Sequence, residues 1–233
     1  MPYTRDENGK RIIGRAGEPW VFVGAGVLAA IAGYVNVVML GFFAVPVSHM
    51  SGAVSRLSGD IALMDMADLI LISGIVAGFL AGAMLSGILI GAATLRAGRR
   101  YGGVLMLQGV MLAAATWLAL DGIALAVPLA AMACGLQNAM ASSYRGLVLR
   151  TTHVTGVVTD IGVLIGQRLR QKKIRIWKLW LLLTLLLSFF AGGVAGALML
   201  QAIGMQALAI AALVCFAVGA VYVLVQHARL QAN

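Results

Sequence analysis

Residues 48–52 are Ser-His-Met-Ser-Gly, and the pattern returns about 104 residues later as Thr-His-Val-Thr-Gly at 152–156. Upstream of this element, Gly-Tyr-Val-Asn at 33–36 returns as Gly-Leu-Gln-Asn at 135–138. Both pairs of segments keep a histidine or an asparagine at the same place between apolar runs. The two pairs therefore indicate that the chain contains an internal repeat.

A third match lies downstream of the histidine elements. Ala-Gly-Phe-Leu-Ala-Gly-Ala at 77–83 returns as Ala-Gly-Gly-Val-Ala-Gly-Ala at 191–197, so the three matches keep their order along the chain. If each half holds three membrane spans, the second half must cross the bilayer upside down relative to the first. Inverted repeats of this kind are typical of secondary transporters, which hold their substrate near the midplane where the halves meet.

The composition is that of an integral membrane protein. Of 233 residues, 61% are hydrophobic, and the mean hydropathy is +0.97. A soluble domain could not bury so much apolar surface. The net charge of +9 would suit nucleic acid, but the basic residues lie in short loops between apolar runs. They therefore indicate the cytoplasmic surface of a lipid bilayer as the partner, and no nucleic acid.

Six apolar stretches are long enough to cross a bilayer, whose core of roughly 30 Å needs about 20 apolar residues per helix. The sequence thus predicts an all-α integral membrane protein with six transmembrane helices in two inverted three-helix repeats, residues 20–120 and 121–226. Residues 1–19 and 227–233 form an N-terminal segment and a C-terminal tail. The predicted spans are about 20–43, 69–95, 102–120, 122–144, 176–200 and 203–226.

Positive charge alternates with the number of the span. Lys and Arg gather before the first span and after the second, fourth and sixth, whereas the remaining loops are acidic or neutral. Because basic loops stay in the cytoplasm, both termini are predicted to be cytoplasmic, with 44–68 outside and 145–175 inside. The basic residues on the inner side include Arg15, Arg96, Arg145, Lys172 and Lys173.

The segments after the first and fourth spans are too long to be tight hairpins. Each contains a helix start, with Ser51 or Thr155 as the predicted N-cap before a glycine and an apolar run. Short helices over about 52–65 and 156–170 are expected, each roughly 20 Å long. They are either re-entrant half-helices at membrane depth or amphipathic helices in the interface.

The repeated histidines are the first candidates for a site. His49 and His153 occupy equivalent positions beside the hydroxyl groups of Ser51, Thr152 and Thr155 at the starts of helices. Ring N–H groups, hydroxyls and backbone N–H groups together can bind an anion or a carboxylate-bearing solute, and an imidazole can also accept a proton. In the alternative interpretation, each histidine braces its own loop by bonding a neighbouring carbonyl.

Amide side chains within the spans are the second group of candidates. Asn36 lies in the first predicted span, and Gln137 and Asn138 lie in the fourth. Because an amide in hydrocarbon is costly unless it is hydrogen-bonded, these side chains should face the bundle interior. They either bind solute at the midplane or tie the two spans together. We expect one shared polar cavity lined by Asn36, His49, Ser51, Asn138, His153 and Thr155.

Two carboxylates lie in the predicted short helices. Asp160 has apolar neighbours on both sides in the sequence, which makes it a candidate for proton or cation coupling in the substrate site. Asp60, by contrast, is expected to sit in water beside Arg56.

The sequence holds no recognisable enzyme motif. It has no Gly-x-Ser-x-Gly elbow, no His-Glu-x-x-His, no P-loop and no paired Cys or His at metal spacing. Cys134 and Cys215 both lie within apolar runs, so they indicate no disulfide framework. We therefore expect no catalytic residue, no cofactor and no metal site.

The chain resembles the YoaK family of small bacterial inner-membrane proteins, which are classed as a domain of unknown function. The resemblance implies a multi-pass protein of the bacterial inner membrane and no particular substrate. Two departures are that the family often has Asp at the position of Asn36 and Asn at that of Ala53, so any cation held there in relatives would be held differently here. The resemblance rests on the motifs at 33–36, 48–52, 135–139 and 150–162.

Together these features predict a protein that moves a small solute, anionic or amide-bearing, by a transporter or channel-like mechanism. Six spans are few for alternating access in one chain, so a homodimer is plausible. The alternative from another class is a non-transporting membrane scaffold or sensor, whose polar motifs are purely structural.

Overall fold

The computed structural model describes residues 4–5, 11–12, 19–64, 66–90, 99–142, 150–171, 174 and 176–231. Several sequence-based predictions fall outside these residues. They concern most of the N-terminal segment 1–19, the end of the C-terminal tail and the ends of two spans at 95 and 144. The basic residues Arg15, Arg96, Arg145, Lys172 and Lys173 lie outside them too.

The described residues form helices joined by turns and short loops, together with one short antiparallel pair, β1 (Thr4–Arg5) with β2 (Arg11–Ile12). The prediction of an all-helical protein is therefore confirmed for this part of the chain. The helices are α1 (Pro19–Phe43), α2 (Met50–Leu63), α3 (Met66–Ile90), α4 (Arg99–Leu120), α5 (Ala126–Ser142), α6 (Val154–Leu169), α7 (Ile176–Ile203), the 3-10 helix η1 (Gly204–Gln206) and α8 (Ala207–Gln231).

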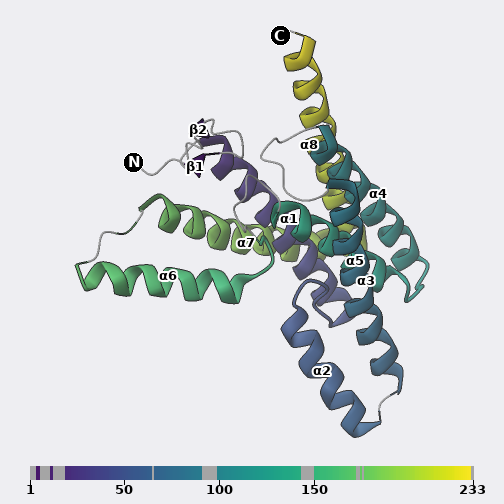
Figure 1. The fold of residues 1–233 in the computed structure, drawn as a ribbon. Helices are drawn as coiled ribbons and strands as arrows, with labels where there is room; N and C mark the ends of the chain where they lie inside the picture. The colour runs from purple at the N-terminus through teal and green to yellow at the C-terminus, as the bar shows by residue number, and fades with distance from the viewer. Residues whose placement is uncertain are drawn as a thin grey trace.

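Four helical stretches of the described chain are long and apolar enough to cross a membrane: Val21–Phe43, Met66–Ile90, Arg100–Leu120 and Ile176–Ala228. The last stretch contains both α7 and α8, which leave η1 in different directions (Figure 1). Gly204 has a φ of +61° at this turn, a conformation that glycine adopts without steric cost. A further apolar helix, Ala126–Met140 within α5, is shorter.

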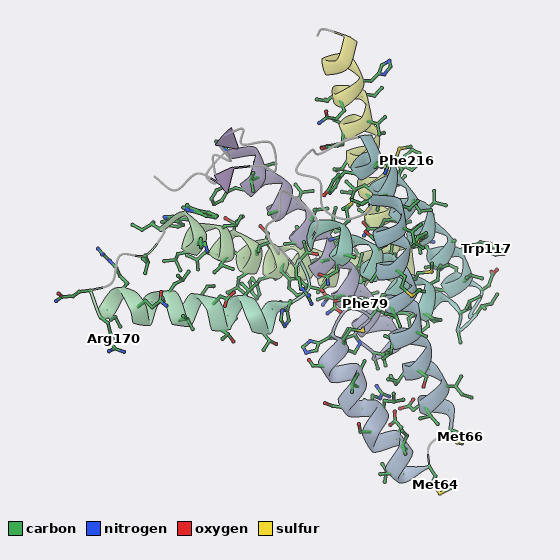
Figure 2. All side chains as sticks on the ribbon, viewed as in Figure 1. Met64, Met66, Phe79, Trp117, Arg170 and Phe216 are labelled. Carbon is green, nitrogen blue, oxygen red and sulfur yellow. The ribbon has the colours of Figure 1, made fainter. Side chains whose placement is uncertain are left out.

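Large apolar side chains cover much of the outer surface. Trp117 and Phe216 point away from the bundle in Figure 2, and Trp117 is 63% exposed. Leu213 is 70% exposed on α8. Soluble monomers rarely expose so many large apolar groups together, whereas lipid tails solvate them. The helices therefore have the character of a membrane protein.

Helices α1 and α7 cross at glycines. A β-carbon added to Gly192 of α7 would overlap the carbonyl oxygen of Ala30 in α1, and one turn later Gly196 lies against the backbone of Tyr34. The residue numbers of the contacts rise together along both helices, so α1 and α7 run in the same direction. Only glycine permits backbones to approach this closely.

Helices α3 and α5 cross in the same way. β-carbons added to Gly78 and Gly82 of α3 would overlap the carbonyl oxygens of Pro128 and Met132 in α5. These helices also run in the same direction. Each Gly-x-x-x-Gly pair thus contacts a helix from the other half of the chain.

The two crossings share one register. Gly33 of α1 lies against the carbonyl of Phe189, and its repeat counterpart Gly135 of α5 lies against the carbonyl of Phe79. By these contacts Gly82 corresponds to Gly192. The sequence pattern had matched Gly82 with Gly196, which lies one helical turn later. Glycine recurs every four residues in both segments, so the sequence alone could not fix this register.

Helices α4 and α8 form a third close pair. Gly102 lies against the carbonyl of Gly219, and further along α4, Gly109 lies against the carbonyl of Ala212, nearer the start of α8. As the residue number of the contact rises along α4, it falls along α8, so the two helices are antiparallel. In Figure 1 the start of α1 and the end of α8 lie on the upper side, opposite the lower turn between α2 and α3.

Adding one methyl group at a crossing tests this packing. We expect Gly82→Ala to lower the free energy of unfolding by about 1–3 kcal/mol, because the new β-carbon overlaps backbone that cannot move aside. The matched control is Gly87→Ala in the same helix, where no atom lies within 4 Å. Thermal unfolding in detergent should show no loss for Gly87→Ala, and equal stability of the two variants would contradict the close crossing.

Candidate functional site

The repeated histidines are the N-cap residues of the two short helices. Helix α2 begins at Met50 and α6 at Val154, and neither His49 nor His153 makes a side-chain capping hydrogen bond. Short helices were predicted in these places and are confirmed. The predicted N-caps, Ser51 and Thr155, are wrong, because both residues lie inside the first helical turn, two positions after the cap.

The glycine of each motif makes room for the imidazole ring. A β-carbon at Gly52 would lie 3.3 Å from Cδ2 of His49, and one at Gly156 would lie 2.6 Å from Nδ1 of His153. Each ring therefore folds over the first turn of its own helix. This contact explains why a glycine follows each histidine at the third position.

Equivalent asparagines brace the loops before the two helices. Oδ1 of Asn36 accepts hydrogen bonds from the backbone N–H and the hydroxyl of Ser48, at 3.3 and 2.7 Å. Oδ1 of Asn138 accepts one from the backbone N–H of Thr152, at 3.4 Å. Because these bonds fix the residue just before each histidine, they hold both rings in place.

Gln137 belongs to a buried network. Its Nε2 donates to the carbonyl of Leu28, at 2.7 Å, and to the hydroxyl of Thr151, at 3.2 Å. Its Oε1 accepts a 2.6 Å bond from Nε2 of Gln108. Gln137 thus ties α5 to α1, to α4 and to the loop before α6, which is the structural alternative considered for these amides.

Both histidine motifs line a single cavity of about 220 Å³. Its walls come from the starts of α2 and α6, from Asn138 of α5 and from Phe79 of α3, which is labelled in Figure 2. Segments about 104 residues apart in the sequence thus meet at one place. The lining residues are Ser48, His49, Met50, Ser51, Phe79, Asn138, Arg150, Thr152, His153, Val154 and Thr155.

A second cavity, of about 520 Å³, lies between α6 and α7. Its walls include Arg150 and His153, which also line the first cavity. The two spaces therefore adjoin along these two side chains. The lining residues are Arg150, His153, Gly156, Val157, Asp160, Leu182 and Leu185.

Arg150 is a site residue that the sequence prediction missed. Arg150 lines both cavities, and its carbonyl oxygen accepts a 3.3 Å hydrogen bond from the backbone N–H of His153. The sequence feature that could have identified Arg150 as a site residue is its position three residues before His153. Because Arg150 belongs to the basic segment 145–175, its charge served in the sequence only to predict the orientation in the membrane.

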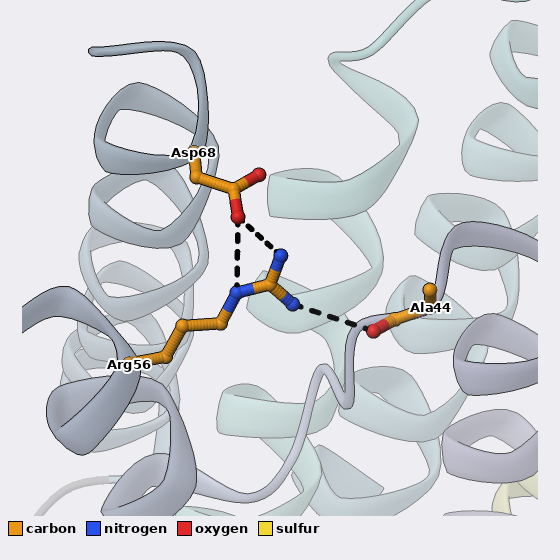
Figure 3. A network of polar contacts seen from close by, with 3 residues as sticks. All are labelled: Ala44, Arg56 and Asp68. Atoms are coloured by element: carbon orange, nitrogen blue, oxygen red, sulfur yellow. Dashed lines mark hydrogen bonds and ion pairs between the residues drawn. The ribbon is translucent and has the colours of Figure 1, made fainter. Parts of the chain in front are cut away.

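The two carboxylates are placed opposite to expectation. Asp60 is 8% exposed, and its Oδ2 has no hydrogen-bond partner among the described residues. It does not sit in water beside Arg56, whose guanidinium instead binds Asp68 and the carbonyl of Ala44 (Figure 3). Asp160 is exposed and lines the second cavity. The sequence could not show which face of each short helix packs on its neighbour.

The predicted site residues therefore separate into three groups. His49, Ser51, Asn138, Thr152, His153 and Thr155 line the first cavity. Asp160 lines only the second. Asn36 and Gln137 line neither of these cavities and hold the surrounding backbone.

A family model described as "Protein of unknown function (DUF1275)" matches residues 24–221. No curated protein and no solved structure matches the chain. The description agrees with the expected membership in a family of unknown function, while the YoaK name stays a prediction.

The position of the His153 ring can be tested without a ligand. We expect Gly156→Ala to displace the ring, because the new β-carbon would lie 2.6 Å from Nδ1. With only three histidines in the chain, selective labelling gives few ring signals in an NMR spectrum. Those of His153 should shift in Gly156→Ala and stay in place in Gly162→Ala, where nothing lies within 4 Å. Unchanged His153 signals in Gly156→Ala would refute this ring position.

Proposed function

The chain belongs to the family described as "Protein of unknown function (DUF1275)", and from its site we propose that it transports a small anionic or amide-bearing solute across a membrane. One observation carries the proposal: the histidine motifs of both halves line a single cavity of about 220 Å³. A space of this size suits a small metabolite or inorganic anion rather than a drug-sized ligand.

The charges of the cavity favour an anion. Its lining includes Arg150, His49, His153 and Asn138, and among the described residues it includes no Asp or Glu. Hydroxyl groups from the two motifs add further hydrogen-bond donors. Guanidinium and imidazole groups bind carboxylates and oxyanions by charge-assisted hydrogen bonds, and the amide and hydroxyls suit an amide-bearing solute equally well.

Two helix starts reinforce this preference. The first residues of α2, Met50 and Ser51, and those of α6, Val154 and Thr155, line the cavity. The N-terminus of a helix carries partial positive charge on backbone N–H groups. Half-helices whose N-termini face an anionic substrate are a recurring feature of secondary transporters. The N-termini of α2 and α6 both border the cavity of about 220 Å³.

Six spans fit the lengths of the helices. The stretch Ile176–Ala228 has 53 residues, roughly 80 Å of helix against a bilayer core of about 30 Å. It therefore provides two spans, α7 and α8, divided at η1. Helix α5 has 17 residues, about 26 Å, which a modestly thinned bilayer accommodates. With α1, α3 and α4, these helices make six spans.

The directions of the helix pairs support an inverted repeat. If six spans alternate in direction, α1 is parallel to α7, α3 is parallel to α5, and α4 is antiparallel to α8. The glycine contacts give the same relative direction within each of these three pairs. We therefore assign residues 20–120 and 121–226 to two three-span repeats, related by an axis in the membrane plane, with α2 and α6 as half-helices. Both termini are proposed to be cytoplasmic, in a bacterial inner membrane.

The second cavity provides a route to one side. It adjoins the first at Arg150 and His153 and is bounded by α6 and α7. In the proposed orientation this route leads to the cytoplasm. A homodimer is compatible with this arrangement.

A membrane scaffold or sensor is the second candidate. The bonds of Asn36 to Ser48 and of Gln137 to Leu28 favour it, because some polar groups of the motifs hold backbone and line neither cavity. A scaffold would require no transport and no solute, so a flux measurement separates the two functions.

Transport is tested with the purified protein in liposomes and a panel of radiolabelled small anions and amides. We expect His153→Ala to reduce flux roughly tenfold, because an anion would lose a charge-assisted hydrogen bond. The matched control is Thr159→Ala, six residues further along on α6. Its hydroxyl is exposed, bonds the carbonyl of Thr155 and lines neither cavity. Equal flux in both variants would remove His153 from the mechanism, and no flux for any solute would favour the scaffold.

The inverted arrangement is tested by cysteine accessibility. The last residues of α2 and α6, Leu63 and Leu169, are 81% and 79% exposed. We expect an impermeant maleimide added to intact cells to label Leu63→Cys and to label Leu169→Cys only after permeabilisation. The native cysteines, Cys134 and Cys215, are buried and give little background. Labelling of both sites from the same side would refute the inversion.

A further inference from the structure

The first cavity is built by a duplicated motif, but its lining is not symmetrical in charge. His49 and His153 form a matched pair, whereas Arg150 comes from the second half of the chain. The corresponding position of the first half, 104 residues earlier, is Pro46, which does not line the cavity. Among the described lining residues, permanent positive charge therefore comes from one half alone.

Arg150 is not paired with an acid in the part of the chain that the structure describes. Asp160 lines the second cavity with it, and no Asp or Glu among the described residues lines the first. A guanidinium group is a planar fork whose N–H donors match the two oxygens of a carboxylate. One such group suits a solute with one anionic end.

An aromatic residue of the lining is also unmatched. Phe79 of α3 lines the cavity, and its carbonyl lies against Gly135. The carbonyl of Phe189 lies in the same way against Gly33, the repeat counterpart, so Phe189 is the equivalent residue of α7. Phe189 packs instead in a separate apolar cluster with Leu185 and lines neither cavity. The aromatic part of the lining therefore comes from the first half.

Apolar side chains also follow both motif histidines. Met50 and Val154 are the first residues of α2 and α6, and both line the cavity with Phe79. An inorganic oxyanion carries oxygens on all sides, and those that face apolar side chains would lose their hydrogen bonds with water. A solute with an apolar body gains from the same contact. The lining thus favours an organic anion over an inorganic one.

We propose that the first cavity binds a small monocarboxylate with an apolar or aromatic body, the carboxylate on Arg150 and the body against Phe79. The proposal rests on the transport function above and names the class of its solute. Sites for small organic molecules are mostly apolar, with a few polar groups that fix the orientation of the ligand. The first cavity combines the same two kinds of side chain.

Benzoate is a suitable probe, because it combines one carboxylate with one apolar ring. Equilibrium binding of radiolabelled benzoate is measured on the full-length protein in lipid nanodiscs, with empty nanodiscs as the blank. Inorganic phosphate lacks the ring and benzamide lacks the charge, so each should compete at least about tenfold more weakly than unlabelled benzoate. Absence of specific benzoate binding, or equal competition by phosphate or benzamide, overturns the proposal.

Substitutions of the two aromatic residues test the apolar end. We expect Phe79→Leu to weaken benzoate binding about tenfold through loss of the ring contact, and Phe79→Tyr, which keeps the ring, to retain most of it. The matched control is Phe189→Leu, which changes the equivalent ring outside the cavity and should leave benzoate binding unchanged. Equal binding by Phe79→Leu and Phe189→Leu, both still folded by thermal unfolding, would remove the ring contact.

Substitutions of two arginines test the anionic end. Arg150→Gln should weaken benzoate binding about tenfold, because the carboxylate loses its charge-assisted hydrogen bonds. Arg168→Gln is the matched control, since Arg168 is an exposed residue of α6 that lines neither cavity. Unchanged binding in Arg150→Gln would refute the assignment of the carboxylate to this residue.

The binding assay and the flux assay fail separately. Benzoate that binds with these dependences but is not moved across the liposome membrane would reject transport and keep the carboxylate site. Flux of inorganic phosphate or of an amide that ignores Phe79→Leu would reject the carboxylate site and keep transport.

Discussion

The direct backbone contact between helices of opposite halves is the constraint on which the rest of the structure depends. At Gly33 and Gly192 in one crossing, and at Gly82 and Gly135 in the other, a β-carbon would overlap a carbonyl of the partner helix. The contact also builds the candidate site, because Phe79 presents its carbonyl to Gly135 and lines the cavity between the histidine motifs. Moving the helices apart by one methyl group would displace both motifs at once.

Polar residues within the bundle divide into those that hold backbone and those that line space. The side chains of Asn36 and Gln137 form hydrogen bonds with neighbouring loops and helices. His49 and His153 fold over their glycines and line the cavity without capping their helices. A buried amide without a partner is costly, so the amides must bond locally. The histidines, exposed to the cavity, are not under this requirement.

The two halves of the chain carry the same elements with different polar contacts around the short helix. An ion pair between Arg56 and Asp68 joins α2 to α3, and Ile75 of α3 is fully buried. Helix α6 packs on α7 through Val157, beside a cavity that Asp160 and Leu185 line.

The sequence by itself determined the helical class, the apolar character and the positions of the short helices, because hydropathy, length and the repeated motif are local properties. It also identified the histidines as a matched pair. Only the tertiary structure decided which glycines face each other, since the Gly-x-x-x-Gly spacing fits two registers one turn apart. Only it added Arg150 to the site and exchanged the surroundings of Asp60 and Asp160, because the face that a short helix buries depends on its neighbour, and no local pattern records that neighbour.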